Sequence, residues 1–280
     1  MKNIKLCLRK IIYTVPGAQN CWIGLNKFIY RVTIKPAFSG WGMTTHALPW
    51  LNGGDALARD FLRANQKIIT KVVQGEFKLS QFNAMQDKKI ILNELMWRHY
   101  IVFWSAHYAA KSTNCLIKNL AECGVCDGLT AYFAMSALRG EKNEFKAFLY
   151  DAWEGMRSED LLQSEMGSVG NYNYLNIETT KHNLAEFQGN ATFIKGFIPE
   201  SFKTSDNPTE LVWLHIDLNS SLPTTAALQF FFEKIPPGGV MLFDDYAFCY
   251  DTKIAVDEYF LSKRGVLLPL PTGQAIYFKH

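Results

Sequence analysis

The chain has 280 residues, of which 48% are hydrophobic and 14% are aromatic, so it can bury a sizeable core in one large domain or two small ones. Its 29 basic and 26 acidic side chains leave a formal net charge of +3, and no dense basic patch is interleaved with aromatic residues, which argues against nucleic-acid binding. No apolar run reaches the roughly 18 residues of a membrane-spanning helix.

The N-terminal segment 1–15 scatters basic residues among apolar ones and lacks the uninterrupted apolar stretch and cleavage site of a signal peptide. Two interpretations of this segment stay open: a solvated helix face, or peripheral contact with a membrane surface. The basic residues concerned are Lys2, Lys5, Arg9 and Lys10. Six cysteines in a chain without a secretion signal are expected to be reduced thiols. We therefore expect a cytoplasmic protein of enzyme size, and homo-oligomerisation stays open.

The first part of the chain contains a loop-like aromatic segment, Phe38–Asp55, followed by stretches of helical periodicity at Ala56–Gln74 and Ile90–His107. We expect residues 1–95 to form a helical cap on the substrate side and residues 96–280 to form the main domain. Three side chains of the aromatic segment are candidates for acceptor contacts: Trp41, His46 and Trp50.

From about Asn119 onward, apolar runs alternate with helical segments and short turns, which is typical of a parallel sheet with helices on its faces. The predicted strands are Leu116–Cys123, Lys146–Asp151, Thr192–Lys195, Leu211–Asp217, Val240–Asp244, Gly265–Pro269 and Ala275–Lys279. The predicted helices lie near Gly128–Leu138, Glu178–Gln188, Thr224–Lys234 and Thr252–Lys263. The last two strands flank a Pro-Thr-Gly turn and therefore indicate an antiparallel hairpin. The long connection Ala152–Tyr174 is polar, and loops of this length are often functional.

The first candidate site is the turn that follows the first strand. Gly124 and Gly128 allow tight turning and close backbone approach to a ligand, and the following helix offers free N–H groups to a carboxylate or phosphate. The pattern G-x-G-x-x-G is absent, which weakens a dinucleotide interpretation. An ordinary strand-to-helix turn is the alternative.

The second candidate is Asp151, which closes the second strand 23 residues after Gly128. In doubly wound folds an acid about twenty residues beyond the first turn binds ribose hydroxyls. An acid at this position can instead cap a helix. Trp153 either stacks on a base or packs in the core, and the sequence does not choose between these.

The third candidate is a set of acids that follow two strands: Asp217 after one, Asp244 and Asp245 after the other. The carboxyl ends of parallel strands line one crevice, so these carboxylates are expected to meet there. They can bind a divalent cation, or one of them can act as a base. The alternative is that they cap the following loops.

Two further features point to structure rather than chemistry. Cys123 and Cys126 form C-x-x-C, but no second pair of ligands lies at zinc-finger spacing, which argues against a zinc site. A redox pair is the other interpretation of these two cysteines, and it is not the favoured one. His215 lies on a buried strand and is expected to be a satisfied core histidine, with a role as catalytic base as the weaker alternative.

Taken together, the motifs resemble class I S-adenosylmethionine-dependent methyltransferases, specifically the macrocin O-methyltransferase (TylF-like) family. The resemblance covers about residue 98 to the C-terminus. The matching segments are E-C-G-V-x-x-G at Glu122–Gly128, D-x-x-E-G at Asp151–Gly155, a partial K-G-x-F at Lys195–Phe197, P-G-G at Pro237–Gly239 and D-D-Y at Asp244–Tyr246. The C-terminal PLPTGQAIYFK is similar to the closing hairpin of that family.

The resemblance implies an α/β fold, a doubly wound Rossmann-like seven-stranded sheet with an antiparallel last strand. It also implies methyl transfer from S-adenosylmethionine to a hydroxyl, usually on a sugar, with Mg²⁺ held by acids. The implied cofactor-binding residues are Glu122, Gly124, Val125, Gly128, Asp151 and Gly196. The implied metal ligands are Asp217, Asp244 and Asp245, and Asp217 is also the candidate base.

One segment departs from the family pattern. Where macrolide-sugar members have D-G-D-x-Y-E-S-T, this chain has DLNSSLPTT, with Leu218 and Asn219 in place of the glycine and the second acid. Retention of the metal and the macrolide-sugar substrate are therefore both in question. The leading hypothesis is a Mg²⁺-assisted O-methyltransferase acting on a sugar, a glycan or a glycosylated small molecule. The alternatives are a metal-dependent hydrolase or nucleotide-sugar transferase, and a catalytically silent binding module.

Overall fold

The computed structural model describes residues 55–81, 88, 92–139, 144–203 and 206–280. The predictions for the basic N-terminal segment and for Trp41, His46 and Trp50 lie outside these residues, so they stay predictions, as does the domain boundary at residue 95. Residues 54–280 form one compact unit. In the described ranges, no helix is both long enough and apolar enough to cross a membrane.

Seven strands form a single sheet in the order β3-β2-β1-β4-β5-β7-β6. Their bounds are β1 Lys118–Cys123, β2 Phe145–Asp151, β3 Ala191–Lys195, β4 Trp213–Ile216, β5 Val240–Phe243, β6 Leu268–Pro269 and β7 Ala275–Phe278. Strands β1 to β5 pair in parallel, and β7 is antiparallel to both β5 and β6. The predicted doubly wound, Rossmann-like α/β class with an antiparallel last strand is confirmed.

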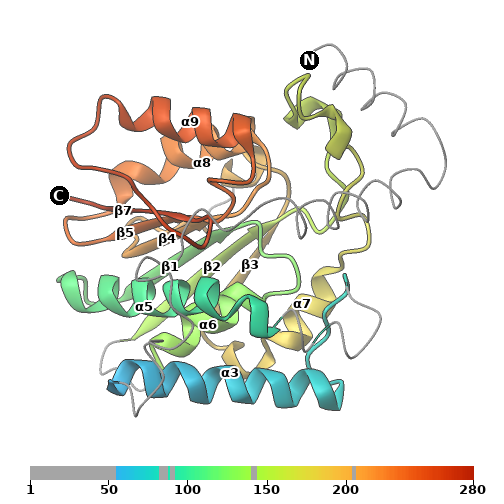
Figure 1. Ribbon diagram of the computed structural model, residues 1–280, viewed down its shortest axis with the longest axis vertical. Coiled ribbons are helices and arrows are strands. Elements are labelled where there is room, and N and C mark those ends of the chain that lie inside the picture. The colour runs from blue at the N-terminus through green and yellow to red at the C-terminus, as the bar shows by residue number, and fades with distance from the viewer. Residues whose placement is uncertain (1–54, 82–87, 89–91, 140–143, 204–205) are drawn as a thin grey trace, which may run out of the picture. The chain divides into compact units, whose positions relative to one another are not determined.

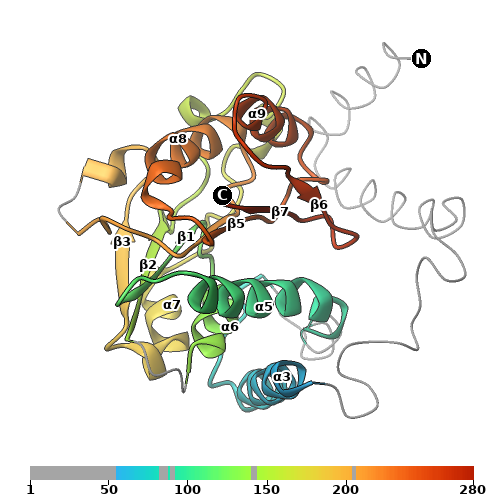
Figure 2. The ribbon, with the colours of Figure 1, turned by 90° about the vertical axis from the view of Figure 1, so that its left-hand side faces the viewer.

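Helices cover both faces of this sheet (Figures 1 and 2). On one face lie α5 Met96–Ser112, α6 Leu129–Ala137 and α7 Ile177–Asn183, and on the other lie α8 Ser221–Phe231 and α9 Tyr250–Phe260. Because the sheet is covered on both sides, every residue of β4 and β5 is buried. This explains why these strands read as continuous apolar runs in the sequence.

Helix α3, Ala56–Gln74, forms a further layer outside α5 and α6 (Figure 2). Its bounds are those predicted, because both ends carry strong signals: Asp55 Oδ1 accepts from the Ala58 amide at 2.7 Å, and Gly75 ends the helix in a left-handed conformation. Its Phe61 ring anchors it to the neighbouring helices. The contacting rings are Tyr100 and Phe103 of α5 and Phe133 of α6.

The strand order places a topological switch point between β1 and β4. The chain moves from β1 outward to β2 and β3, and then returns to the opposite side of β1 to form β4. Crevices at such points, outside the carboxyl ends of the strands, are where ligands bind in open α/β sheets. The predicted site segments follow β1, β2, β4 and β5, so the fold brings all of them to this edge.

Candidate functional site

The turn after β1 and the turn after β4 meet at Gly124 and Asp217. Gly124 follows β1 with φ +89°, and a Cβ built on it would lie 1.8 Å from the carbonyl oxygen of Asp217. The Asp217 amide donates to the Cys123 carbonyl oxygen at 2.8 Å. Only glycine combines this backbone conformation with this approach, so Gly124 fixes the floor of the switch-point crevice.

Asp151 organises the turn after β1 through its carboxylate. Its Oδ2 accepts from the Val125 and Cys126 amides at 2.8 Å each, and its Oδ1 accepts from the Trp153 amide at 2.6 Å. Burial raises the pKa of Asp151, while these backbone hydrogen bonds oppose the rise. Each carboxylate oxygen has two lone pairs; Oδ2 uses both for the two amides, so the predicted contact with a ribose hydroxyl is compatible with this geometry through Oδ1.

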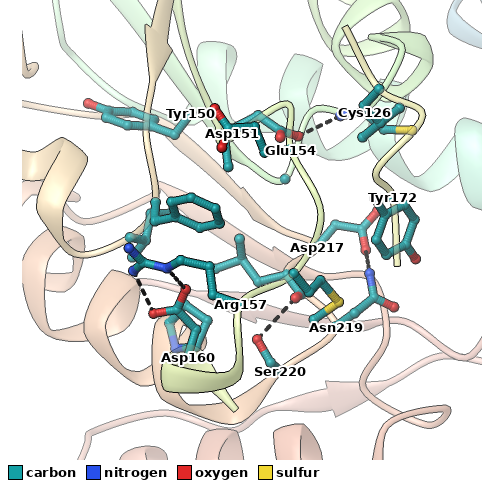
Figure 3. A pocket seen from close by; sticks show the side chains of 18 of the residues that line it. Cys126, Tyr150, Asp151, Glu154, Arg157, Asp160, Tyr172, Asp217, Asn219 and Ser220 are labelled. Atoms are coloured by element: carbon teal, nitrogen blue, oxygen red, sulfur yellow. Dashed lines mark hydrogen bonds and ion pairs between the residues drawn. The ribbon is translucent and has the colours of Figure 1, made fainter. Parts of the chain in front are cut away.

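A first cavity opens at the ends of β2, β3 and β4 (Figure 3). Asp151 and Gly196 line it at the strand ends, and Met156, Arg157 and Asp160 line it from the connection after β2. Its apolar wall consists of Phe197, Ile198, Leu218 and Pro223. The Arg157 guanidinium lies 3.9 Å from the Phe197 ring centroid and donates to Asp160 at 2.6 and 2.8 Å. The lining of the cavity therefore combines apolar side chains with the carboxylates of Asp151 and Asp160.

A second cavity adjoins the first on the β5 side. It is lined by the three predicted acids, by Val125 of the turn after β1, by Leu129 at the start of α6, and by Arg98 and His99 of α5. One oxygen from each of Asp217, Asp244 and Asp245 lies within 4.8 Å of the others. The predicted convergence of these carboxylates is therefore confirmed.

The two cavities share part of their lining, namely Gln81, Gly124, Cys126, Tyr172, Asp217 and Asn219. Figure 3 shows Tyr172 beside Asp217 and Asn219. Tyr172 has φ +67° and Asn219 has φ +54°, a conformation that is unusual for a bulky side chain such as tyrosine. A molecule in the first cavity and a molecule in the second would thus meet across Asp217 and Tyr172.

The acids differ in their electrostatic surroundings. Burial and the neighbouring carboxylates of Asp245 and Asp244 raise the pKa of Asp217 well above its usual range. Burial and Asp244 likewise raise the pKa of Asp245, and its Oδ2 is buried with no hydrogen-bond partner. Burial also acts to raise the pKa of Asp244, but His215, Arg98 and Gln274 together hold it below its usual range.

Behind the acids runs a buried chain of polar side chains that crosses the sheet. Glu122 Oε1 lies 2.9 Å from His215 Nδ1, and His215 Nε2 lies 3.5 Å from Asp244 Oδ1. Glu122 is 1% exposed and His215 is fully buried. Burial opposes protonation of His215, yet the neighbouring carboxylates of Asp244 and Glu122 raise its pKa to about 9. The imidazolium therefore partly neutralises the acids from inside the core.

These contacts place several predicted residues differently from the sequence argument. Glu122 and His215 line neither cavity among the described residues, so both act from inside the core, and the weaker alternative of His215 as a base finds no support. Gly128, with φ +86°, is the N-cap of α6 and packs against Leu184. Trp153 packs in the core, where its Nε1 donates to Thr180 Oγ1 at 2.8 Å.

Arg98 is a site residue that the sequence did not reveal. It comes from α5, and its guanidinium donates to Asp244 from 146 positions away in the chain. An arginine in a helical segment has no local sequence signal for such a role.

The C-x-x-C cysteines are free, and burial raises the pKa of both thiols; neither feature favours a thiolate metal site.

We compared the sequence and the fold with those of known proteins. Residues 121–246 match the family model described as a methyltransferase domain. The structure is similar to the O-methyltransferase NovP, with a TM-score of 0.59 and 19% identity over 66% of this chain and 80% of that one. It is also similar to the calicheamicin methyltransferase CalS11, with a TM-score of 0.51 and 18% identity over 86% of this chain and 99% of that one. No curated protein matches the sequence. The chain thus has the fold of these methyltransferases, and its match to a methyltransferase domain spans the strand ends that build both cavities.

Proposed function

We propose that the protein is an S-adenosylmethionine-dependent O-methyltransferase, assisted by Mg²⁺, that methylates a hydroxyl of a sugar, a glycan or a glycosylated small molecule. The observation that carries this proposal is the pair of adjoining cavities that share Gly124, Tyr172 and Asp217. Group transfer between two bound molecules requires donor and acceptor to be held in contact and in line. The methyltransferase-domain match supports the choice of methyl as the transferred group.

The first cavity suits the donor. Its apolar wall, which includes Phe197 and Leu218, would contact an adenine ring, and Asp151 would bind the ribose hydroxyls. The turn from Gly124 to Gly128, at the N-terminus of α6, would receive the amino-acid end. The sulfonium carbon would then point toward the wall shared with the second cavity.

The second cavity suits the acceptor and a cation. The chemistry of the donor set fits Mg²⁺, because three carboxylates converge and the buried Asp245 Oδ2 lacks a partner. The residues that would hold the ion are Asp217, Asp244 and Asp245, and a bound cation would lower the pKa of an acceptor hydroxyl. Asp217 lines both cavities, and this position suits it to take the hydroxyl proton as the methyl group passes from sulfur to oxygen.

The replacement of the family's second acid by Asn219 is compatible with this assignment. Asn219 Nδ2 lies 3.3 Å from Asp217 Oδ1 and donates to it. An amide cannot take a proton from the acceptor, which leaves Asp217 as the acid that lines both cavities in the described chain. The acceptor itself is proposed from the resemblance to sugar O-methyltransferases.

The test is transfer of a labelled methyl group from S-adenosylmethionine to a panel of sugars, glycans and glycosides, with and without EDTA. We expect a Mg²⁺-dependent transfer that Asp217→Asn lowers at least about 100-fold, the scale of a lost general base. Glu178→Gln is the control, because Glu178 is exposed and, within the described part of the chain, forms an ion pair only with Lys181. Release of phosphate or sugar from nucleotide-sugars without methyl transfer would instead support the hydrolase or transferase alternative. Cofactor binding without any turnover would support a silent binding module.

A further inference from the structure

The acidic cluster of the second cavity already contains a cation of the chain itself. Arg98 Nη2 donates to Asp244 Oδ2 and to the Asp244 carbonyl oxygen, the latter at 3.1 Å. The same nitrogen lies 3.9 Å from Asp245 Oδ1. The Arg98 side chain is only 17% exposed, so its charge is largely withdrawn from water and acts on the two acids at close range.

Arg98 is held in this place from several sides. Its Nη1 donates to the Thr272 carbonyl oxygen at 3.3 Å, in the turn between β6 and β7, and its guanidinium lies 5.3 Å from the Phe248 ring centroid. Arg98 is the third residue of α5, where the helix dipole disfavours a positive charge. Its position is therefore accounted for by the acids and not by the helix that carries it.

Asp244 has little capacity left for another ligand. Its Oδ1 accepts from Gln274 Nε2 at 2.8 Å and faces His215 Nε2 at 3.5 Å, while its Oδ2 is engaged by Arg98. Asp245 Oδ2, in contrast, has no partner. A divalent cation that uses all three acids must therefore share Asp244 with Arg98, at a distance where two positive charges repel each other.

We propose that Arg98 is an internal counter-ion that competes with the divalent cation for Asp244 and thereby sets the affinity of the site. This inference rests on the cation site of the proposed function. Without the cation, the guanidinium binds Asp244 and lies close to Asp245, and so offsets part of the repulsion among the carboxylates. When the cation binds, the contact between Arg98 and Asp244 must weaken or be lost, so the affinity of the site is lower than three carboxylates alone would give.

The experiment measures Mn²⁺ binding to the full-length protein through the paramagnetic resonance signal of free Mn²⁺, without any acceptor. We expect Arg98→Gln to bind Mn²⁺ at least about tenfold more tightly than the wild type, and Arg98→Lys, which keeps the charge, to stay near the wild type. Arg139→Gln is the matched control, because Arg139 is paired with Glu186 and lines neither cavity. Unchanged or weaker binding by Arg98→Gln beside a wild type that binds would overturn the inference and leave the cation site intact.

A second measurement covers the case in which Arg98→Gln does not fold, since removing one partner of a largely buried ion pair is destabilising. In wild-type protein with ¹⁵N-labelled arginine, the Arg98 side-chain resonance should shift with the same midpoint as Mg²⁺ binding. Saturation with Mg²⁺ while that resonance stays fixed would refute the competition. If folded wild type and Arg98→Gln both fail to bind Mn²⁺, both this inference and the cation site are wrong. Titration of the same samples with S-adenosylhomocysteine then shows whether the donor site of the proposed function survives.

Discussion

Replacing Gly124 by alanine should damage both the fold and the cofactor site, for a reason that can be worked out from the structure. At φ +89° an alanine pays about 1–2 kcal/mol of backbone strain. Its Cβ would also lie 1.8 Å from the Asp217 carbonyl oxygen, whereas contacts below 3.0 Å essentially never occur, so the turn after β1 and the end of β4 must move apart. Both are backbone segments in the centre of the sheet and cannot rotate away as a side chain can.

We therefore expect Gly124→Ala to lose at least about 3 kcal/mol of unfolding free energy, within the range seen when a substitution forces backbone to shift. For a unit of this size this corresponds to a fall in Tm of about 6–12 °C. Gly75→Ala is the control, because Gly75 has φ +76° with nothing within 4 Å of the added Cβ. Gly75→Ala should lose only the free energy of backbone strain, and its Tm should fall by about 2–4 °C for each kcal/mol lost.

The assay is thermal and denaturant unfolding followed by circular dichroism, with calorimetric titration of S-adenosylhomocysteine into each folded variant. Gly124→Ala should also bind the cofactor product more weakly, while Gly75→Ala should bind it as the wild type does. If the two variants lose the same stability, the close approach of Gly124 to Asp217 does not exist, and the geometry assigned to the crevice floor is wrong.

Three other predictions concern polar side chains that are held by hydrogen bonds or ion pairs. The pKa of His215 is raised from 6.5 to about 9, so its contribution to stability is complete below pH 6.5 and is lost as the pH rises through 9; denaturant titrations should show this decline in the wild type and a flatter profile in His215→Gln. Burial opposes ionisation of Glu186, but three cationic partners lower its pKa to about 2, so its contribution is present above pH 4.5 and is lost as the pH falls toward 2. Glu186→Gln should therefore destabilise the protein at pH 7 and have little effect near pH 2, and an equal loss at both would contradict the pairing. Trp153→Phe removes the donor to Thr180 and to the Cys126 carbonyl oxygen and should cost about 1–3 kcal/mol, measured by urea unfolding; an unchanged midpoint would show that this indole is not a structural donor.

The strands and the acidic cluster could be predicted because their signals are local. The central strands β4 and β5 are buried runs followed by acidic turn residues, and the parallel arrangement carries the residues after them to one edge. Asp217, Asp244 and Asp245 therefore had to be close together once the fold class was known. Predicted strand ends differ from the observed ones by a few residues in either direction, as in Leu211–Asp217 for Trp213–Ile216 and Thr192–Lys195 for Ala191–Lys195, because apolar composition does not show where ladder hydrogen bonds begin and stop.

The partners of the acids could not be predicted, because they depend on pairings across the sheet. Glu122 and His215 are 93 positions apart, and their contact follows from the register of β1 against β4. The same limit explains why Glu122 was expected to face the cofactor: alternation along a strand gives two faces, but the side chain of Glu122 points to a histidine of the next strand. Trp153 was left open for the same reason, since its partner Thr180 comes from α7.

Calorimetric titration of S-adenosylhomocysteine into the purified protein shows directly whether the first cavity binds the methyl donor. We expect binding with 1:1 stoichiometry in EDTA-treated wild type, weakened at least about tenfold in Asp151→Asn and unchanged in Glu178→Gln. Folded wild-type protein that shows no binding, with or without Mg²⁺, would rule out a methyl-donor site in this cavity and would direct the search to nucleotide-sugars.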